Sequence, residues 1–573
     1  MPWLLLLSLS AQAREAPWQG TINEAFSAAK AADHRWAGPF PLDGLARRFG
    51  GHVDTDLNAL PAEGLNLLYG DPSTHPALAR VLAWHHIALD AEGVTLGRTR
   101  LQLPDPFLIA ALPLPGHPER PVLVYTAWSA TAQPGLNRIF HGPTPLVVGS
   151  HDVDTPHTAY AGPIALDDEG RLDHLRSGAP RMSATEAVED LRTLLHQLDQ
   201  GWAGIEGLDA TLQAQGSSWA AKQAEAEAAL SAKAELEWSE VHEVLRSLLR
   251  AVQDSHFSLQ GQVITEEGRV ISVRDTFVHR LRPCFVDGRL VEEGGLWSLD
   301  GAPVSSPPAP VPGPKEVQEG VVYRFPTLLR DGQPASLIGL FSAEETCPAT
   351  LPFAGQARAL HRPRGAFQGD WAPWGLEEGP VPVLAVRTMQ REQLDGMPAT
   401  ARSLRSAERL ILDLRMNGGG ADQPAYDWVN GLQAGPYRWA PGANLRAGDA
   451  PRDQRWRQWG ERTHRGWRRR AGFSGLLYVL TDNDIYSSGE TFVQLAAQVP
   501  GARVVGLNTA GCVRYGNISS HAPLPHTGLV ATFGHTTFDW SAIRPEVEGV
   551  GIFPDVWLDE ADPVAFLTQL GQP

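Results

Sequence analysis

Arg409-Leu-Ile-Leu-Asp-Leu-Arg-Met-Asn-Gly-Gly-Gly420 and Leu477-Tyr-Val-Leu-Thr-Asp-Asn-Asp-Ile-Tyr-Ser-Ser-Gly-Glu490 are the two most informative stretches of the chain. Each begins as a short apolar run, continues into a turn and leads into a helical pattern. From about residue 380 this alternation predicts strands at 381–386, 410–414, 476–480 and 503–506, and helices at 397–406, 421–432 and 488–499. Alternating strands and helices favour a parallel, layered α/β core.

The two turns carry the two halves of an acyl-transfer site. Gly418, Gly419 and Gly420 expose backbone N–H groups to close approach, as an oxyanion hole requires. Ser487 stands at a helix start, which stabilises negative charge that develops nearby. Both features also have plainer interpretations. Three glycines make a flexible turn, and Ser487 to Glu490 reads as a capping box, which that pattern taken alone favours.

A base and an orienting carboxylate are the further needs of a serine nucleophile. His256 follows a helical segment in Asp-Ser-His, and imidazole is the base best suited to neutral pH. Since the chain has 19 histidines, position alone selects none of them. Glu546 and Glu548 lie in Glu-Val-Glu-Gly-Val-Gly-Ile-Phe-Pro-Asp555, either as solvated loop carboxylates or as the group that orients the base.

Four motifs in order carry a family resemblance. Leu-Asp-Leu-Arg-Met-Asn-Gly-Gly-Gly, then Ser-Ser-Gly-Glu, then Val504-Val-Gly-Leu-Asn-Thr-Ala-Gly511, then Glu548-Gly-Val-Gly-Ile-Phe-Pro-Asp555 resemble the tail-specific proteases of family S41. The resemblance covers residues 380 to 560, and residues 184 to 256 loosely. It implies a ClpP/crotonase-like α/β core that needs no metal and no organic cofactor. It also implies that Ser487 is the nucleophile and that the N–H groups of Gly420 and Ser488 form the oxyanion hole.

The family has two catalytic variants, and the residues distinguish them. The Ser–Lys dyad places lysine directly after the glycine of a T-x-G motif, where this chain has Cys512. No lysine follows Lys315, and the other three, at positions 30, 222 and 233, match no family position. The tricorn-like variant uses an upstream Ser-His pair and a late glutamate. Ser255-His256 and Glu548 are similar to these, which implies a relay from Glu548 through Ser255 and His256 to Ser487, with Glu546 as the alternative carboxylate.

The remaining sequence predicts several further units around this core. They are a signal peptide over 1–13, an accessory α+β domain of unknown role over 14–170, a helical segment with the Ser-His pair over 184–256, a PDZ-like β-rich domain over 257–355 and the catalytic core over 380–573. Helices are expected at 187–198, 221–234 and 239–252. Gly294 to Val304, read as strand, turn and strand, is similar to part of a PDZ domain. Such a module binds chain ends by strand addition and can hold the site latent.

Composition and charge exclude other classes of protein. A net charge of −17 argues against nucleic-acid binding, so the Arg- and Trp-rich stretch 452–470 is interpreted as a surface loop or flap. Three cysteines without a CxxC pair argue against a zinc site. Cys284 and Cys347 are able to pair if the compartment is oxidising. A chain of 573 residues is too long for a single core.

The N-terminus indicates export. An apolar run ends in an A-x-A pattern at Ala13, which is typical of a signal peptide cleaved there, although no lysine or arginine precedes the run. Without such a signal the protein would be cytoplasmic. No other segment has ~18 consecutive apolar residues, so no stable membrane insertion is expected after the signal is removed.

These features predict an exported serine peptidase that acts on unfolded polypeptides or peptides, and they allow a homo-oligomer. One alternative is a non-catalytic ligand carrier on the same scaffold, similar to retinoid-binding relatives of the family. A ligand carrier, however, has no need of Ser487, His256, Ser255 and Glu548 together. Another alternative is a metal site at His151 to His157, whose spacing matches no recognised ligand set.

Overall fold

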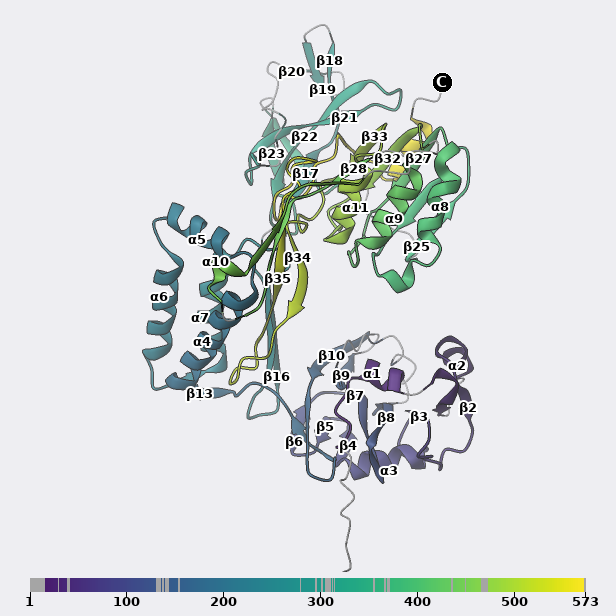
Figure 1. The fold of residues 1–573 in the computed structure, drawn as a ribbon, viewed down its shortest axis with the longest axis vertical. Coiled ribbons are helices and arrows are strands. Elements are labelled where there is room, and N and C mark those ends of the chain that lie inside the picture. The colour runs from purple at the N-terminus through teal and green to yellow at the C-terminus, as the bar shows by residue number, and fades with distance from the viewer. Residues whose placement is uncertain are drawn as a thin grey trace, which may run out of the picture.

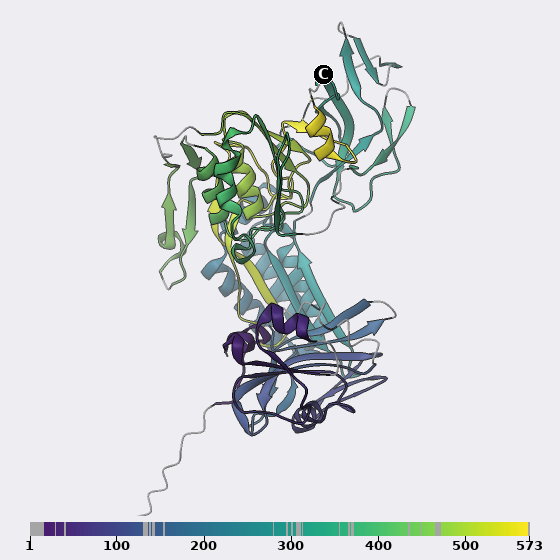
Figure 2. The ribbon, with the colours of Figure 1, turned by 90° about the vertical axis from the view of Figure 1, so that its right-hand side faces the viewer.

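The computed structural model describes residues 16–28, 30–38, 42–129, 136, 139, 144–152, 155–278, 280–293, 296–299, 302–304, 311, 313, 315–353, 356–364, 367, 372–433, 436–448, 450–464 and 472–570. The expected signal peptide lies outside these residues, as do 294, 295, 300 and 301 of the PDZ-like motif, 153 and 154 of the metal alternative, and 465–470 of the Arg-rich stretch. Figure 1 shows the N-terminal unit at one end of the molecule, and the α/β core and a β-rich unit at the other. Figure 2 shows the last two beside each other, and they share an apolar cluster.

The core is built on a six-stranded sheet whose strands run parallel except at one edge. In sheet order the strands are β25 (Trp374–Glu377), β26 (Val383–Val386), β27 (Arg409–Asp413), β32 (Leu476–Thr481), β33 (Ala502–Gly506) and β36 (Val556–Trp557). Its helices are α8 (Met397–Ser403), α9 (Gln423–Leu432), α11 (Ser488–Ala496) and α12 (Pro563–Gln569). The α/β fold and the alternation expected from residue 380 onward are confirmed, with helix ends shifted by a few residues.

Side chains of the central strands alternate between two covered faces. On β27, Leu410 and Leu412 pack in one apolar cluster with Trp428 of α9 and Phe492 of α11. Ile411 points to the other face and packs in the cluster of α12. Because both faces are covered, the strand reads as a continuous apolar run. The carboxyl ends of β27 and β32 are paired side by side, so the two turns identified in the sequence begin next to each other.

The N-terminal unit contains a seven-stranded mixed sheet covered by short helices. The strands, in sheet order, are β10 (Thr155–Gly162), β9 (Leu146–Asp152), β7 (Pro106–Leu114), β8 (His117–Ala127), β3 (Leu65–Tyr69), β1 (His34–Ala37) and β2 (His52–Asp54). Strands β8, β3, β1 and β2 are parallel and the others antiparallel. The helices are α1 (Ile22–Ala28), α2 (Asp43–Phe49) and α3 (Pro76–Trp84). The unit thus combines helices and strands, as expected, around a partly parallel sheet.

The helical segment confirms the expected helices and adds one. The helices are α4 (Ala184–Gly201), α5 (Ile205–Ala214), α6 (Trp219–Ser231) and α7 (Trp238–Leu248). They pack against a long sheet in the order β16 (Val270–Thr276), β15 (Ser258–Ile264), β35 (Val530–Phe538), β29 (Gly442–Leu445) and β30 (Trp456–Trp459), with β34 (Tyr515–Ser520) paired to β35. Strands β15 and β16 therefore join a sheet of the core, and the separate β-rich unit begins only after them.

Arginines of the stretch 452–470 attach this sheet to the helical segment. In the short helix α10 (Arg452–Arg455), Arg452 donates to the carbonyl of Asp199 at 2.7 Å and to Glu206 at 2.8 Å. Arg455 donates to the carbonyls of Asp199 at 2.9 Å and Gln200 at 3.0 Å. These carbonyls end α4, where cations are favoured. The described part of the stretch is therefore not a loop, because it forms α10, β30 and β31 (Arg462–His464), and Arg452 and Arg455 make a clasp between two units.

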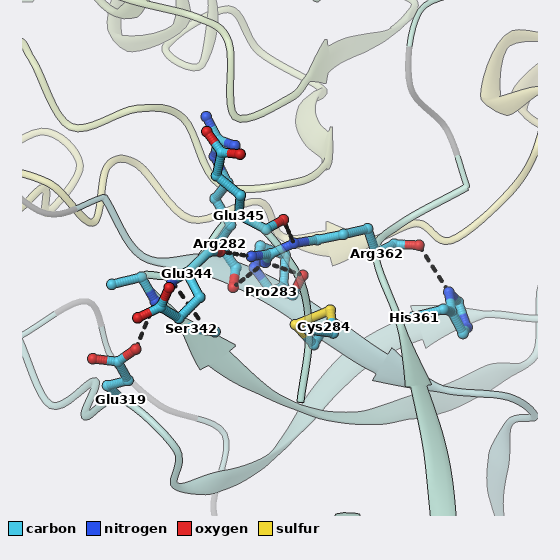
Figure 3. The surroundings of a disulfide bond; sticks show 11 residues. Arg282, Pro283, Cys284, Glu319, Ser342, Glu344, Glu345, His361 and Arg362 are labelled. Atoms are coloured by element: carbon cyan, nitrogen blue, oxygen red, sulfur yellow. Dashed lines mark hydrogen bonds between the residues drawn. A yellow bond between two sulfur atoms is a disulfide. The ribbon is translucent and has the colours of Figure 1, made fainter. Parts of the chain in front are cut away.

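The β-rich unit is a sheet in the order β20 (Ala302–Val304), β19 (Leu296–Leu299), β18 (Leu290–Glu293), β22 (Pro334–Ser342), β17 (Arg282–Val286), β24 (Gln356–His361) and β23 (Thr350–Phe353), with β21 (Val322–Leu328) paired to β22. Strands β19 and β20 are antiparallel neighbours, as the sequence predicts. A disulfide joins Cys284 to Cys347 with 5.9 Å between the Cα atoms. Arg362 donates to the carbonyls of Arg282 at 3.0 Å and Glu345 at 3.2 Å, so it fastens both sides of the disulfide (Figure 3).

Candidate active site

Ser487 occupies a strained turn between β32 and α11. Its φ is 50° and its ψ −120°, a backbone conformation that a residue with a side chain rarely adopts. A serine on such a strand-to-helix turn projects its hydroxyl outward, as nucleophilic serines of other hydrolases do. The hydroxyl makes no capping hydrogen bond to the helix. The capping-box interpretation is therefore wrong, and the hydroxyl is not committed to the helix end.

Glu490, the other half of the supposed cap, has partners elsewhere. Its buried carboxylate accepts the hydroxyl of Thr509 and the N–H groups of Gly511 at 2.9 Å and Cys512 at 2.5 Å. Burial raises the pKa of this carboxyl to about 7. Glu490 thus binds the loop after β33 to the start of α11, and this loop contains the position of the dyad lysine. Cys512 there is buried, and burial raises the pKa of its thiol.

The glycine turn after β27 lies directly against Ser487. The N–H of Tyr486 donates to the carbonyl of Asn417 at 2.9 Å, which joins the two turns. Gly419 has φ 85°, and a Cβ there would stand 3.0 Å from the Cβ of Ser487 and 2.9 Å from the carbonyl oxygen of Tyr486. Gly420 has φ 143°, and its Cβ would stand 2.4 Å from the carbonyl carbon of Met389. Only glycine fits both positions.

Two N–H groups at this contact remain free. Gly419 donates its N–H to the side chain of Asn417 at 3.1 Å and is thereby occupied. The Ser488 hydroxyl donates to the carbonyl of Gly420 at 2.8 Å, which holds the two backbones together. The N–H groups of Gly420 and Ser488 donate to no acceptor among the residues that the structure describes. The structure therefore brings together both groups that the sequence assigned to an oxyanion hole.

Ser255 and Glu548 are also in contact. The Ser255 N–H donates to Oε2 of Glu548 at 3.1 Å, and the Arg514 N–H donates to Oε1 at 3.2 Å. The Ser255 hydroxyl donates to the carbonyl of Gly511 at 2.7 Å. Glu548 is buried. Burial, and then the charges of Asp254 and Glu546, raise its pKa well above the usual range.

His256 lies beside this pair without completing the relay. Both ring nitrogens are buried and neither has a hydrogen-bond partner among the described residues, so the bonds to Ser255 and to Ser487 are not formed. Burial, and then the positive charge of Arg280, lower the pKa of the imidazole to about 4. The ring is thus neutral at pH 7 and able to accept a proton.

Two neighbours of His256 were missed by reasoning from the sequence. Asp254 is fully buried, accepts the His256 N–H at 2.9 Å and the Trp202 indole N–H at 2.9 Å, and has an oxygen 4.0 Å from Nδ1 of His256. Burial raises its pKa to about 6. Arg280 contacts the ring of Tyr486 with its guanidinium carbon 4.2 Å from the centroid. The position of Asp254, two residues before His256, could have indicated its place in the site. No feature of the sequence indicated Arg280.

The alternative carboxylate, Glu546, belongs to different surroundings. Its Oε2 is buried without a partner among the described residues, and burial raises its pKa to about 7. It lines a cavity of about 720 Å³ together with Arg514, Trp456, Trp459 and Phe538.

No three metal-binding side chains are gathered anywhere in the described residues. No helix there is long and apolar enough to cross a bilayer.

The two turns, the following α11 and the loop that ends in Asp555 all lie within the range that matches a known family. Residues 381–557 match the model of peptidase family S41. No curated protein matches the chain in sequence. Among solved structures, mature CPAF shares 15% identity, with 65% of this chain and 93% of CPAF covered and a TM-score of 0.37. The photosystem II D1 C-terminal processing protease shares 13% identity, with 68% of this chain and 97% of that protease covered and a TM-score of 0.33. The tricorn protease shares 20% identity, with 33% of this chain and 16% of that protease covered and a TM-score of 0.21.

Proposed function

We propose that this protein is a serine peptidase that cleaves unfolded polypeptides or peptides, with its S41 domain supplying the nucleophile and the helical segment supplying the base. Ser487 attacks the scissile carbonyl carbon while His256 takes the hydroxyl proton. The N–H groups of Gly420 and Ser488 stabilise the oxyanion. His256 then returns the proton to the leaving amine, and water releases the acyl group from Ser487 by the same steps.

The observation that carries this proposal is the contact between the two turns. A serine with φ 50° and an uncapped hydroxyl stands at a helix start, with the free N–H groups of Gly420 and Ser488 on either side of one backbone contact. A ligand carrier has no use for a strained serine beside two unpaired donors. The peptidase therefore accounts for more of the site than a binding protein does.

Ser255 and Glu548 are proposed as positioning residues for the base. Glu548 already accepts the Ser255 N–H, so a rotation of the Ser255 hydroxyl from the Gly511 carbonyl toward His256 would connect the relay. The unpartnered imidazole would then bond to Ser487 when a substrate orders the site. Catalytic hydrogen bonds that are open without substrate commonly close in the Michaelis complex.

Export of the protein is a further part of the proposal. The disulfide between the buried Cys284 and the partly buried Cys347 supports it, because structural disulfides persist in oxidising compartments. We expect the mature protein isolated from its native compartment to begin at Arg14, as read by N-terminal sequencing. A mature chain that retains residues 1–13 would contradict export through this signal.

The test of activity is peptide cleavage. The protein without residues 1–13 is incubated with a diverse mixture of unfolded peptides, and new ends are read by mass spectrometry. We expect cleavage that is lost in Ser487→Ala and in His256→Ala, with unchanged thermal unfolding as the control. Cleavage that survives in both variants would remove these residues from the mechanism. No cleavage by the unaltered protein would favour a latent enzyme or a ligand carrier.

A further inference from the structure

Arg280 stands where the β-rich unit meets the catalytic residues. Its guanidinium lies over the ring of Tyr486, the residue before Ser487, and contacts the Tyr486 hydroxyl. The next residue, Leu281, donates its N–H to the carbonyl of Gly549 at 2.8 Å and accepts from Asn508 at 3.1 Å. Arg280 is therefore held between the nucleophile turn and the loop of Glu548.

The charge of this guanidinium is not compensated. Arg280 is half-buried, and no carboxylate lies within 4.0 Å of its guanidinium nitrogens among the described residues. The nearby buried carboxylates have other donors: Asp254 accepts from Trp202 and Glu548 accepts from Ser255. A guanidinium offers five N–H donors, and those removed from water need acceptors.

The hydroxyl and ring of Tyr486 interact with only some of the five N–H donors of the Arg280 guanidinium. An aromatic face attracts a cation but accepts no bidentate pair of hydrogen bonds. A carboxylate matches the remaining donors in both geometry and charge. Because Arg280 contacts Tyr486, the residue before Ser487, a ligand held there would be near the nucleophile turn.

We propose that Arg280 is a specificity-determining residue that binds a carboxylate of the peptide substrate next to the bond cleaved by Ser487. This inference rests on the proposed peptidase function for the identity of the ligand. The carboxylate comes either from an acidic side chain or from the carboxyl end of the peptide. Both sources present the same planar anion to Arg280, and the experiment separates them.

The charge of Arg280 also acts on the base. It lowers the tendency of His256 to hold a proton. A bound carboxylate offsets that charge, so an acidic substrate allows the imidazolium to form more readily during attack on the carbonyl. Substrate recognition and base function are thereby coupled through one residue.

The test measures binding apart from cleavage. Three pools of random octapeptides are prepared: one with amidated ends and no acidic residue, one with free carboxyl ends and no acidic residue, and one with amidated ends and a single glutamate. Their retention on the Ser487→Ala protein is compared with retention on the double variants that add Arg280→Gln, Arg280→Lys or Arg192→Gln. Arg192 is a matched control, because it is an exposed arginine of α4 paired with Glu227, remote from the site.

We expect at least one carboxylate pool to bind about 10-fold more tightly than the neutral pool, which corresponds to about 1.4 kcal/mol of binding free energy for the charge-assisted pair. Arg280→Gln abolishes this preference, Arg280→Lys retains part of it and Arg192→Gln leaves it unchanged. The pool that carries the preference identifies the source of the carboxylate. Equal retention of all pools, including no retention, or a preference that survives Arg280→Gln overturns the proposal.

The same pools are incubated with the protein carrying Ser487, which distinguishes the two proposals. If no pool is cleaved but the carboxylate preference still depends on Arg280, the carboxylate site stands and the peptidase function fails. If peptides are cleaved without regard to carboxylates, the reverse holds. Thermal unfolding of each variant shows whether it is folded. If Arg280→Gln does not fold, the Arg280→Lys variant keeps the test valid.

Discussion

Replacement of Gly419 by alanine tests whether the glycine turn positions the nucleophile. The new Cβ would stand 3.0 Å from the Cβ of Ser487 and 2.9 Å from the carbonyl oxygen of Tyr486, which is closer than ordinary van der Waals contact. The φ of 85° adds strain of roughly 1–2 kcal/mol for an L-residue. Relief of the clash moves Ser487, and a displacement of about 1 Å at a reacting atom lowers the rate by about 100-fold.

The assay for Gly419→Ala combines three readouts: labelling of Ser487 by a fluorophosphonate probe, peptide cleavage and thermal unfolding. Gly418→Ala is the matched control for folding, because a Cβ there meets no atom within 4 Å. We expect slow labelling and cleavage by Gly419→Ala in a protein that still unfolds cooperatively. If folded Gly419→Ala labels as fast as the unaltered protein, the contact between the turns does not set the position of Ser487.

Three further outcomes are expected. Because burial and Arg280 lower the pKa of His256 to about 4, the His256 imidazole followed by NMR titrates near pH 4, and titration near the ordinary value of about 6.5 would contradict the assignment. Glu548→Gln lowers peptide cleavage about 100-fold whereas Glu546→Gln lowers it less than about threefold, and the reverse order in a steady-state assay would exchange their roles. Loss of the Cys284–Cys347 disulfide, which spans 63 residues, destabilises the β-rich unit by about 4 kcal/mol in denaturant unfolding, unless the reduced chain remains structured.

The core was predictable because its signals are local. Leu410, Ile411 and Leu412 form a run that suits a strand covered on both faces, and a glycine turn follows at once. The serine turn repeats this pattern one strand later. The contact between Ser255 and Glu548, which lie 293 residues apart, came from the family resemblance and not from any spacing.

The parts that were not predictable depend on distant partners. Strands β15 and β16 look like the start of the β-rich unit, but Ser258 pairs with Thr532 of β35, and no local pattern specifies such a register. The Ser487 to Glu490 pattern fits a capping box, but the Ser487 hydroxyl does not cap the helix and the carboxylate also accepts the N–H of Gly511. A side chain that could complete a local motif forms a tertiary hydrogen bond when a buried backbone N–H has no other acceptor.

The base and the nucleophile belong to different units, which are joined by the pairing of β15 with β35 and by the apolar cluster around it. Ser255 is bound to Glu548 and Gly511 of the core, yet the imidazole of His256 has no hydrogen-bond partner among the described residues. The clasp of Arg452 and its neighbours on the end of α4 sets how the helical segment sits against the sheet of β35. Catalysis therefore requires that the imidazole, which one unit supplies, reaches the serine hydroxyl that another unit supplies. Activity in this architecture depends on the docking of whole units as much as on the residues that carry out the chemistry.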